Sequence, residues 1–252
     1  MASIGPVAIV TGAARPWGLG RAVAMGLAQE GFGLVVADVR DDWGQEAEAA
    51  IKKETGQKVL YVPTDVSQRA SVHAMMEKTI KEFGRVDVLV NDAGIVVRQR
   101  VEEMTDETYD RIMNVNLRGA FLTCQAVVPS MREQGGGRIV NVASGGAFEP
   151  LKGLSAYAAS KAGMVVFSKV LALETAQYGI VVTTVAPGYM HTGMGGETGP
   201  EEEEMKSGGR GQPFGRTLHP QEVAGVVIFA ATNPSHILTG QTLHANGGAY
   251  MA

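Results

Sequence analysis

The chain has 252 residues, of which 45% are hydrophobic and 19% are charged, and its formal net charge is −4 at pH 7. This length suits one large domain with a sizeable core. The negative charge and the lack of a basic cluster argue against nucleic acid as the main partner. We find neither the features of a signal peptide nor an apolar run of membrane-spanning length, so we expect a cytoplasmic protein without membrane contact.

Cys124 is the single cysteine, so an intramolecular disulfide is impossible and a reducing compartment is expected. The Cys and His spacing of a metal site is absent from the sequence, and we predict no metal ligands.

Short runs rich in β-branched residues alternate with longer segments of helical periodicity. The predicted strands are 7–10, 34–37, 59–62, 86–90, 138–142, 180–185 and 241–244. The predicted helices are 19–30, 43–55, 68–83, 106–133, 155–178 and 220–231. Nearly continuous apolar strands are typical of parallel sheets covered on both faces. The alternation predicts an α/β fold, a doubly wound parallel sheet (Rossmann fold) of about seven strands with helices on both faces, in a single domain over 1–252.

Segment 189–217 breaks this alternation, with many glycines and four consecutive glutamates at 201–204. A loop of this length is usually functional, and it follows the carboxyl end of a strand, where such sheets bind ligands. We expect a substrate loop or lid. The glutamates suit a solvated helix start or lid surface; the alternative is recognition of a cationic substrate.

A glycine-rich turn joins the first predicted strand to the first predicted helix, from Thr11 to Gly20. Glycines there permit a tight turn and close approach of a pyrophosphate to the helix N-terminus. Asp38 ends the second strand, where a carboxylate accepts hydrogen bonds from a ribose 2′-OH and repels a 2′-phosphate. We therefore predict NAD rather than NADP as the cofactor. Arg15 and Arg40 argue the other way, since either is suited to a phosphate.

Tyr157 and Lys161 lie four residues apart in a predicted helix, so both project from the same face. An ammonium beside a phenol favours the phenolate and lowers the tyrosine pKa, which would make Tyr157 a general acid/base. Ser144 lies thirteen positions upstream, at the end of a predicted strand.

These residues together resemble the short-chain dehydrogenase/reductase family over nearly the whole chain. Thr11-Gly12 and Gly18-Leu19-Gly20 resemble the TGxxxGxG turn of that family, with two extra residues around Arg15-Pro16-Trp17. Asn91-Asp92-Ala93-Gly94 resembles NNAG, with Asp92 in place of the second asparagine. The further matches are Asp65-Val66, Asn116, Asn141 to Ser144, Tyr157 with Lys161, Pro187-Gly188 with Thr192, and Thr239 to Gly248.

The resemblance implies a catalytic set of Asn116, Ser144, Tyr157 and Lys161. It implies that Tyr157 exchanges the proton of the substrate alcohol, that Ser144 orients the substrate oxygen, and that Lys161 lowers the tyrosine pKa and binds ribose. Asn116 would hold a relay water. With the turn and Asp38, the implied cofactor-binding residues are Gly12, Arg15, Gly18, Leu19, Asp38, Asp65, Val66, Asn91, Ala93, Gly94, Tyr157, Lys161, Pro187, Gly188 and Thr192.

The substrate is not specified by these patterns. Candidate substrate contacts are Ser144, Gly146, Phe148, Tyr157, Tyr189 and His191. We expect an NAD-dependent oxidoreductase acting on a small-molecule secondary alcohol or ketone. The alternatives are an NADPH-dependent 3-oxoacyl carrier-protein reductase and, from another class, a dinucleotide-sensing binding protein. The resemblance also implies a homotetramer, in which the stripe of Met164, Phe167, Val170 and Leu171 serves either an interface or the core.

Overall fold

The computed structural model describes residues 5–190, 192, 194 and 213–251. Seven parallel strands form one sheet in the order β3-β2-β1-β4-β5-β6-β7. The strands are β1 (Val7–Thr11), β2 (Gly33–Asp38), β3 (Val59–Pro63), β4 (Val88–Asn91), β5 (Gly137–Val142), β6 (Ile180–Pro187) and β7 (Thr242–Ala245). The doubly wound sheet predicted from the sequence is confirmed.

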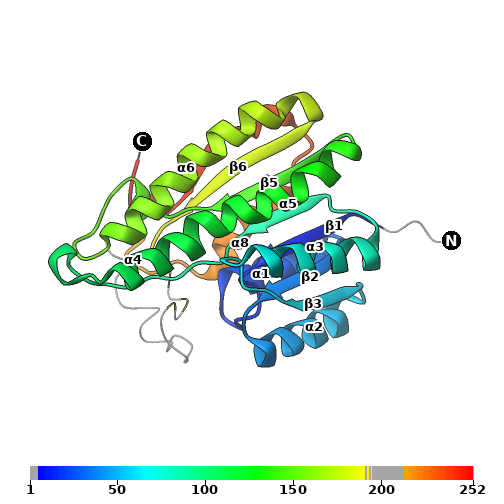
Figure 1. The fold of residues 1–252 in the computed structure, drawn as a ribbon, viewed down its shortest axis with the longest axis horizontal. Helices are drawn as coiled ribbons and strands as arrows, with labels where there is room; N and C mark the ends of the chain where they lie inside the picture. Colours follow the sequence, from blue (N-terminus) through cyan, green and yellow to red (C-terminus); the bar gives the residue numbers. More distant parts are fainter. Residues whose placement is uncertain (1–4, 191, 193, 195–212, 252) are drawn as a thin grey trace.

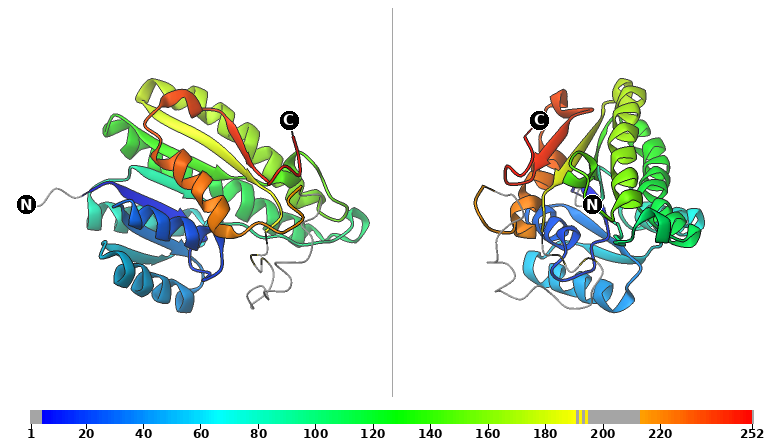
Figure 2. Two further views of the ribbon diagram at one scale, coloured as in Figure 1. Left: turned by 180° about the vertical axis from the view of Figure 1, so that it is seen from behind. Right: turned by 90° about the vertical axis from the view of Figure 1, so that its left-hand side faces the viewer.

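Helices cover both faces of the sheet, as the two opposite views show (Figure 1; Figure 2, left). One face packs against α1 (Leu19–Gln29), α2 (Asp41–Thr55) and α8 (Pro220–Thr232). The other packs against α3 (Arg69–Phe83), α5 (Gly119–Glu133) and α6 (Ser155–Thr175). The core is therefore two apolar layers, which explains why nearly every residue of β1, β4 and β6 is apolar and buried.

The predicted helix over 106–133 is divided into three parts. α4 (Asp106–Met113) leads into a π-helical turn, η2 (Asn114–Arg118), before α5 begins. A single π-helical turn inside a helix is a frequent mark of a functional site, and η2 contains Asn116. The sequence analysis predicts one continuous helix here, because side-chain pattern does not show which backbone groups are hydrogen-bonded, and the i→i+5 bonds of a π-helical turn are a property of the backbone.

Short 3₁₀ turns complete the described structure. They are η1 (Val101–Glu103), η3 (Gly145–Ala147), η4 (Ala176–Tyr178) and η5 (His236–Leu238). The predicted helix over 155–178 consists of α6 followed by η4, and Gly179 ends it at φ 73°. By length and apolar composition Ser155–Tyr178 matches a membrane span, contrary to the sequence expectation. Met164 and Leu171 on this helix are buried in the apolar layers, as in a core helix.

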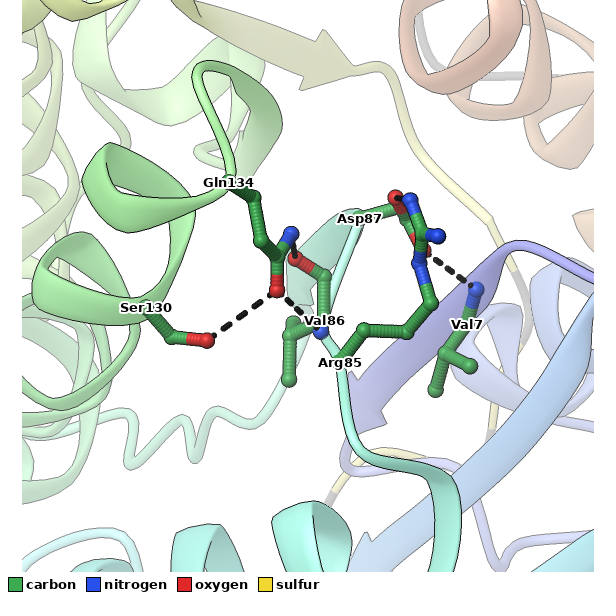
Figure 3. A network of polar contacts seen from close by, with 6 residues as sticks. All are labelled: Val7, Arg85, Val86, Asp87, Ser130 and Gln134. Atoms are coloured by element: carbon green, nitrogen blue, oxygen red, sulfur yellow. Dashed lines mark hydrogen bonds and ion pairs between the residues drawn. The ribbon is translucent and has the colours of Figure 1, made fainter. Parts of the chain in front are cut away.

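A polar network anchors the amino-terminal edge of the sheet (Figure 3). Gln134, at the end of α5, accepts from the Val86 N–H at 3.1 Å and donates to the Val86 carbonyl at 2.9 Å. Asp87 accepts from the Val7 N–H at 2.8 Å and pairs with Arg85. The predicted strand 86–90 therefore begins later, at Val88, because a side chain takes the place of a neighbouring strand at Val86.

Candidate active site

The predicted site residues converge at the carboxyl edge of the sheet. β1 lies between β2 and β4, and Thr11 is the register partner of both Ala37 and Asn91. From β1 the chain first builds the sheet on one side, through β2 and β3, and then on the other side, beginning with β4. Open α/β sheets bind ligands at the point where the strand order reverses in this way.

The turn after β1 is shaped by backbone crowding. Gly12 has φ +70°, and a Cβ added there would lie 2.7 Å from the Ala93 Cα. A Cβ on Gly20 would lie 2.5 Å from the Gly12 carbonyl oxygen. Larger residues do not fit at either position, so the two glycines hold β1, α1 and the segment after β4 in close approach.

Helix α1 begins above this turn with Gly18 as its N-cap, which offers no side chain to the first amides. Leu19 is buried, and the Gly18 N–H donates to the Arg15 carbonyl at 3.0 Å. A helix N-terminus capped by glycine on a tight turn suits an anionic group such as a pyrophosphate. The cradle therefore fits a dinucleotide.

Asp38 is the last residue of β2, and its carboxylate faces the turn. It accepts from the Ala14 N–H at 3.0 Å and the Arg40 N–H at 3.2 Å. Arg40 also pairs with Asp42 at 3.0 Å. The structure thus places Asp38 beside the glycine turn, with its carboxylate bonded to the backbone of both Ala14 and Arg40.

Ser144 and Tyr157 come together from β5 and α6. Ser144 follows β5 in extended conformation, and its hydroxyl accepts from the Gly146 N–H at 3.1 Å. Burial raises the pKa of Tyr157 and the charge of Asp92 raises it further, whereas a hydrogen bond with Ser144 lowers it. The sequence analysis predicts a lowered tyrosine pKa. In the structure the pKa of Tyr157 is raised instead, because the effect of burial is larger than that of the hydrogen bond with Ser144.

Lys161 is buried one helical turn beyond Tyr157, and its ammonium donates to the Val142 carbonyl at 2.7 Å. Burial lowers the pKa of Lys161 to about 8, and Asp92 acts in the opposite direction. Lys161 therefore keeps its charge at neutral pH and loses it readily above that range.

Asn116 is fully buried and its amide is held in place. Its Oδ1 accepts from the Ile95 N–H at 2.8 Å, and its Nδ2 donates to the Ile95 carbonyl and to the Ser160 hydroxyl, both at 3.0 Å. A Cβ on Gly94 would lie 3.4 Å from Asn116 Oδ1 and 3.5 Å from Lys161 Nζ. Gly94 therefore lies between the two side chains.

Asp92 is a functional candidate that the sequence analysis treats only as a departure from a motif. Its carboxylate accepts a hydrogen bond from the Gly20 N–H of α1, and burial raises its pKa to about 6. Its charge acts on both Lys161 and Tyr157. The sequence did contain a signal for Asp92, since a carboxylate stands there in place of the amide of the resembling motif.

Three predicted cofactor residues make contacts to other parts of the protein. Asn91 accepts from the Thr123 hydroxyl at 2.7 Å and donates to Asn141 Oδ1 at 2.8 Å, so its side chain is committed to α5 and β5. Asp65 accepts from both the N–H and the hydroxyl of Ser67. Val66 is buried against Gly119, where a Cβ would approach to 2.8 Å.

The predicted substrate side is partly described. A Cβ on Gly146 would lie 3.4 Å from the Ser144 hydroxyl and 3.9 Å from the Tyr157 ring, so Gly146 leaves room beside both. Phe148 packs against His244, with ring centroids 4.6 Å apart, and stacks on Tyr250. His244 and Tyr250, far away in the sequence, were not predicted to lie here.

Pro187 ends β6 and is buried, and the Gly188 N–H that follows donates to the Ala245 carbonyl at 3.0 Å. Tyr189 is exposed, and the Thr192 N–H donates to the Met190 carbonyl. His191 and the glutamates at 201–204 lie outside the described residues, and the lid over 189–217 stays a prediction. In the part of the chain that the structure describes, no three His, Cys, Asp or Glu side chains gather as a metal site.

Comparison with known proteins agrees with this arrangement. The family model for short chain dehydrogenases matches residues 6–203. The chain is 38% identical over 248 residues to the 3-oxoacyl-[acyl-carrier-protein] reductase FabG of Escherichia coli, covering 98% of each chain. It is 37% identical to (2S)-[(R)-hydroxy(phenyl)methyl]succinyl-CoA dehydrogenase subunit BbsD of Thauera aromatica, over 96% of this chain and 95% of that protein. It is also 37% identical to D-threitol dehydrogenase of Mycolicibacterium smegmatis, over 97% and 92%.

The chain belongs to the short-chain dehydrogenase/reductase family. It is an oxidoreductase of that family, whose members bind a nicotinamide dinucleotide.

Proposed function

We propose that the protein transfers a hydride between NAD(H) and a secondary alcohol or ketone, with Tyr157 as general acid/base. The observation that carries this proposal is the meeting of Tyr157 with Ser144 beside the buried Lys161, at the sheet edge that also holds the glycine turn. A phenol, a hydroxyl and a cation at one edge suit proton exchange with a bound alcohol.

The bound dinucleotide supplies the hydride acceptor or donor. Tyr157 takes the proton of the alcohol during oxidation and returns it during reduction. Ser144 holds the substrate oxygen in line with the phenol. Lys161 supplies the positive charge that favours the phenolate, and it lies one turn away on the same face of α6.

Asn116 orders the proton path from Lys161. Both hydrogens of its amide are already donated, to Ile95 and Ser160. A relay water would therefore bond to the second lone pair of its Oδ1 or to its backbone carbonyl.

NAD is the proposed cofactor because the Asp38 carboxylate ends β2 beside the turn, where it repels a 2′-phosphate. Arg40 is bound to Asp42 by two hydrogen bonds, which reduces its value as a phosphate ligand. Residues Gly12, Gly18, Gly94, Lys161, Gly188 and Thr192 complete the proposed binding set.

A second candidate is reduction of a 3-oxoacyl thioester. Two relatives support it, since one is named as a 3-oxoacyl-[acyl-carrier-protein] reductase and the other as a (2S)-[(R)-hydroxy(phenyl)methyl]succinyl-CoA dehydrogenase subunit. The D-threitol dehydrogenase favours a polyol instead.

We also propose a cytoplasmic homotetramer. Phe121 on α5 and Val166, Val170 and Leu173 on α6 expose apolar surface, and a groove of about 410 Å³ lies between η2, α5 and α6. Within the predicted stripe, Met164 and Leu171 are buried in the core, while Val170 faces outward.

The test is the absorbance change at the nicotinamide band with NAD⁺ or NADP⁺ and a panel containing threitol, a 3-hydroxyacyl-CoA and an aryl carbinol. We expect turnover with NAD⁺ and little with NADP⁺. Tyr157→Phe should reduce kcat by about 10²–10⁴-fold with dinucleotide affinity retained, because it removes only the exchangeable proton. Tyr178→Phe, a tyrosine at the far end of the same helix region, is the control and should be unaffected.

Turnover by Tyr157→Phe close to that of the wild type would contradict the proposed role of the phenol. Turnover with NADP⁺ alone would contradict the role of Asp38. Dinucleotide binding without turnover on any substrate would favour the sensing protein.

A further inference from the structure

The segment of the glycine turn that contains the two extra residues is held in place by hydrogen bonds of Ala14, which precedes it. The Ala14 N–H donates to Asp38, and the Ala14 carbonyl accepts from the buried Arg21 guanidinium at 3.2 Å. Arg21 also pairs with Glu46 on α2. The segment that follows, Arg15-Pro16-Trp17, is therefore tied at its start to β2, α1 and α2.

An aromatic and cationic cluster holds the rest of the segment against α2. The rings of Trp17 and Trp43 meet edge to face, with centroids 5.5 Å apart. The Arg15 guanidinium carbon lies 5.1 Å from the Trp43 centroid and 5.8 Å from that of Trp17. The Arg40 guanidinium lies 3.9 Å from the Trp43 centroid. At these distances each cation is attracted to the face of an indole.

The cluster stands at the adenosine end of the proposed dinucleotide site. Trp43 is in the first turn of α2, and Trp17 directly precedes Gly18, the N-cap of α1. Asp38, which joins the two segments through its bonds to Ala14 and Arg40, is the proposed ligand of the adenosine ribose.

One polar atom of the cluster lacks a partner. Trp17 Nε1 is shielded from solvent, and no hydrogen-bond acceptor for it lies among the residues that the structure describes. A shielded N–H without an acceptor is costly, and such groups in native proteins call for an explanation. An oxygen-rich ligand at the end of β2 would supply the acceptor.

We propose that Trp17 and Trp43, with Arg15 stacked on both, form the wall of the site at its adenosine end, and that Trp17 Nε1–H donates to an oxygen of the adenosine ribose or its phosphate. This inference rests on the proposed dinucleotide binding. It assigns a recognition role to the insertion, which departs from the glycine pattern that the chain otherwise resembles.

The test exploits the fact that these are the only two tryptophans in the chain. Their fluorescence therefore reports on this cluster alone. ADP-ribose and nicotinamide mononucleotide, which carry the two halves of the cofactor, are titrated separately by fluorescence and calorimetry. We expect ADP-ribose to change the emission and nicotinamide mononucleotide to leave it unchanged.

Trp17→Phe keeps a ring and removes the Nε1–H. We expect it to weaken ADP-ribose binding about 3- to 10-fold, as the loss of one hydrogen bond does, while the free protein becomes no less stable. Tyr178→Phe, which removes a polar hydrogen in η4, away from the cluster, is the control and should bind ADP-ribose within about twofold of the wild type.

Unchanged ADP-ribose affinity in Trp17→Phe, with the free protein stabilised, would overturn the inference and leave Trp17 as packing alone. A wild type that binds neither ADP-ribose nor NAD would instead overturn the proposed function. Because the binding measurement needs no turnover, the two failures are distinguishable.

Discussion

Asp92 brings a titratable carboxyl group into the interior of the candidate site, where burial raises its pKa to about 6. In the sequence it stands where the resembling motif has an amide, and in the structure its carboxylate bonds to the first turn of α1 within the field of Lys161 and Tyr157. An amide would make the same bond to Gly20 without a charge. The carboxylate therefore adds a titratable group to the site.

The stability of the protein should depend on pH through Asp92. Its pKa is raised from 3.8 to about 6, so between these values the folded state binds more protons than the unfolded state. Stability contributed by the protonated carboxyl is present below the lower value and is lost as the pH rises through about 6. Asp92→Asn should therefore be more stable than the wild type at pH 7, by on the order of 1–3 kcal/mol, and this gain should vanish towards pH 4.

Urea unfolding of the variant and the wild type across this pH range checks the prediction. Asp110→Asn makes the same chemical change on the exposed face of α4 and serves as the control. A gain that does not change with pH would show that Asp92 is not the titrating group.

At the scale of elements, a buried chain of amides and hydroxyls joins the sheet to the two helices behind it. Thr123 on α5 bonds to Asn91 on β4, Asn91 to Asn141 on β5, and Asn141 to Ser168 on α6, at 2.7 to 2.8 Å. All four residues are buried. Fully satisfied networks of this kind position elements rigidly, and this one holds α6, the helix of Tyr157 and Lys161, against β5.

Asn141→Ala should destabilise the protein by about 2–4 kcal/mol, because it removes two buried hydrogen bonds, the one that Asn141 accepts from Asn91 and the one that it donates to Ser168. Ser168→Ala removes only the last hydrogen bond of the network, the one that Ser168 accepts from Asn141, and should destabilise the protein by about half as much or less. Equilibrium unfolding measures both. Equal losses would indicate that the cost comes from cavities rather than from the amide bridge.

Prediction of the elements succeeded where the pattern is local. Among the residues that the structure describes, the strand and helix periods indicated each strand and α-helix within a few residues, with α4 and α5 predicted as one helix, because the sheet is apolar on both faces. The π-helical turn at Asn114–Arg118 and the late start of β4 were missed. The first depends on hydrogen-bond register and the second on Gln134, which is distant in sequence from Val86.

At the scale of the whole molecule, α5 and α6 present apolar surface beyond what the core uses. Leu173 is 82% exposed and Val170 is 47% exposed. The double variant Val170→Asp with Leu173→Asp should reduce the mass measured by size exclusion with light scattering from that of a tetramer to a dimer or monomer, because charges would be buried at the contact.

Val101, 72% exposed in η1 and away from α5 and α6, provides the control. Val101→Asp should leave the mass unchanged. A wild type that is already monomeric, or a double variant of unchanged mass, would contradict an interface on these helices.

The sequence by itself determined the fold class, the glycine turn, Asp38 and the order of Ser144, Tyr157 and Lys161, because each depends on local pattern and on short spacings along the chain. The tertiary structure alone decided which groups act on one another. It brought Asp92 to α1 and Lys161, and it packed Trp17 on Trp43 and Phe148 on His244. It also decided the direction of the tyrosine pKa, since burial depends on every segment that packs around the phenol and not on the spacing to one lysine.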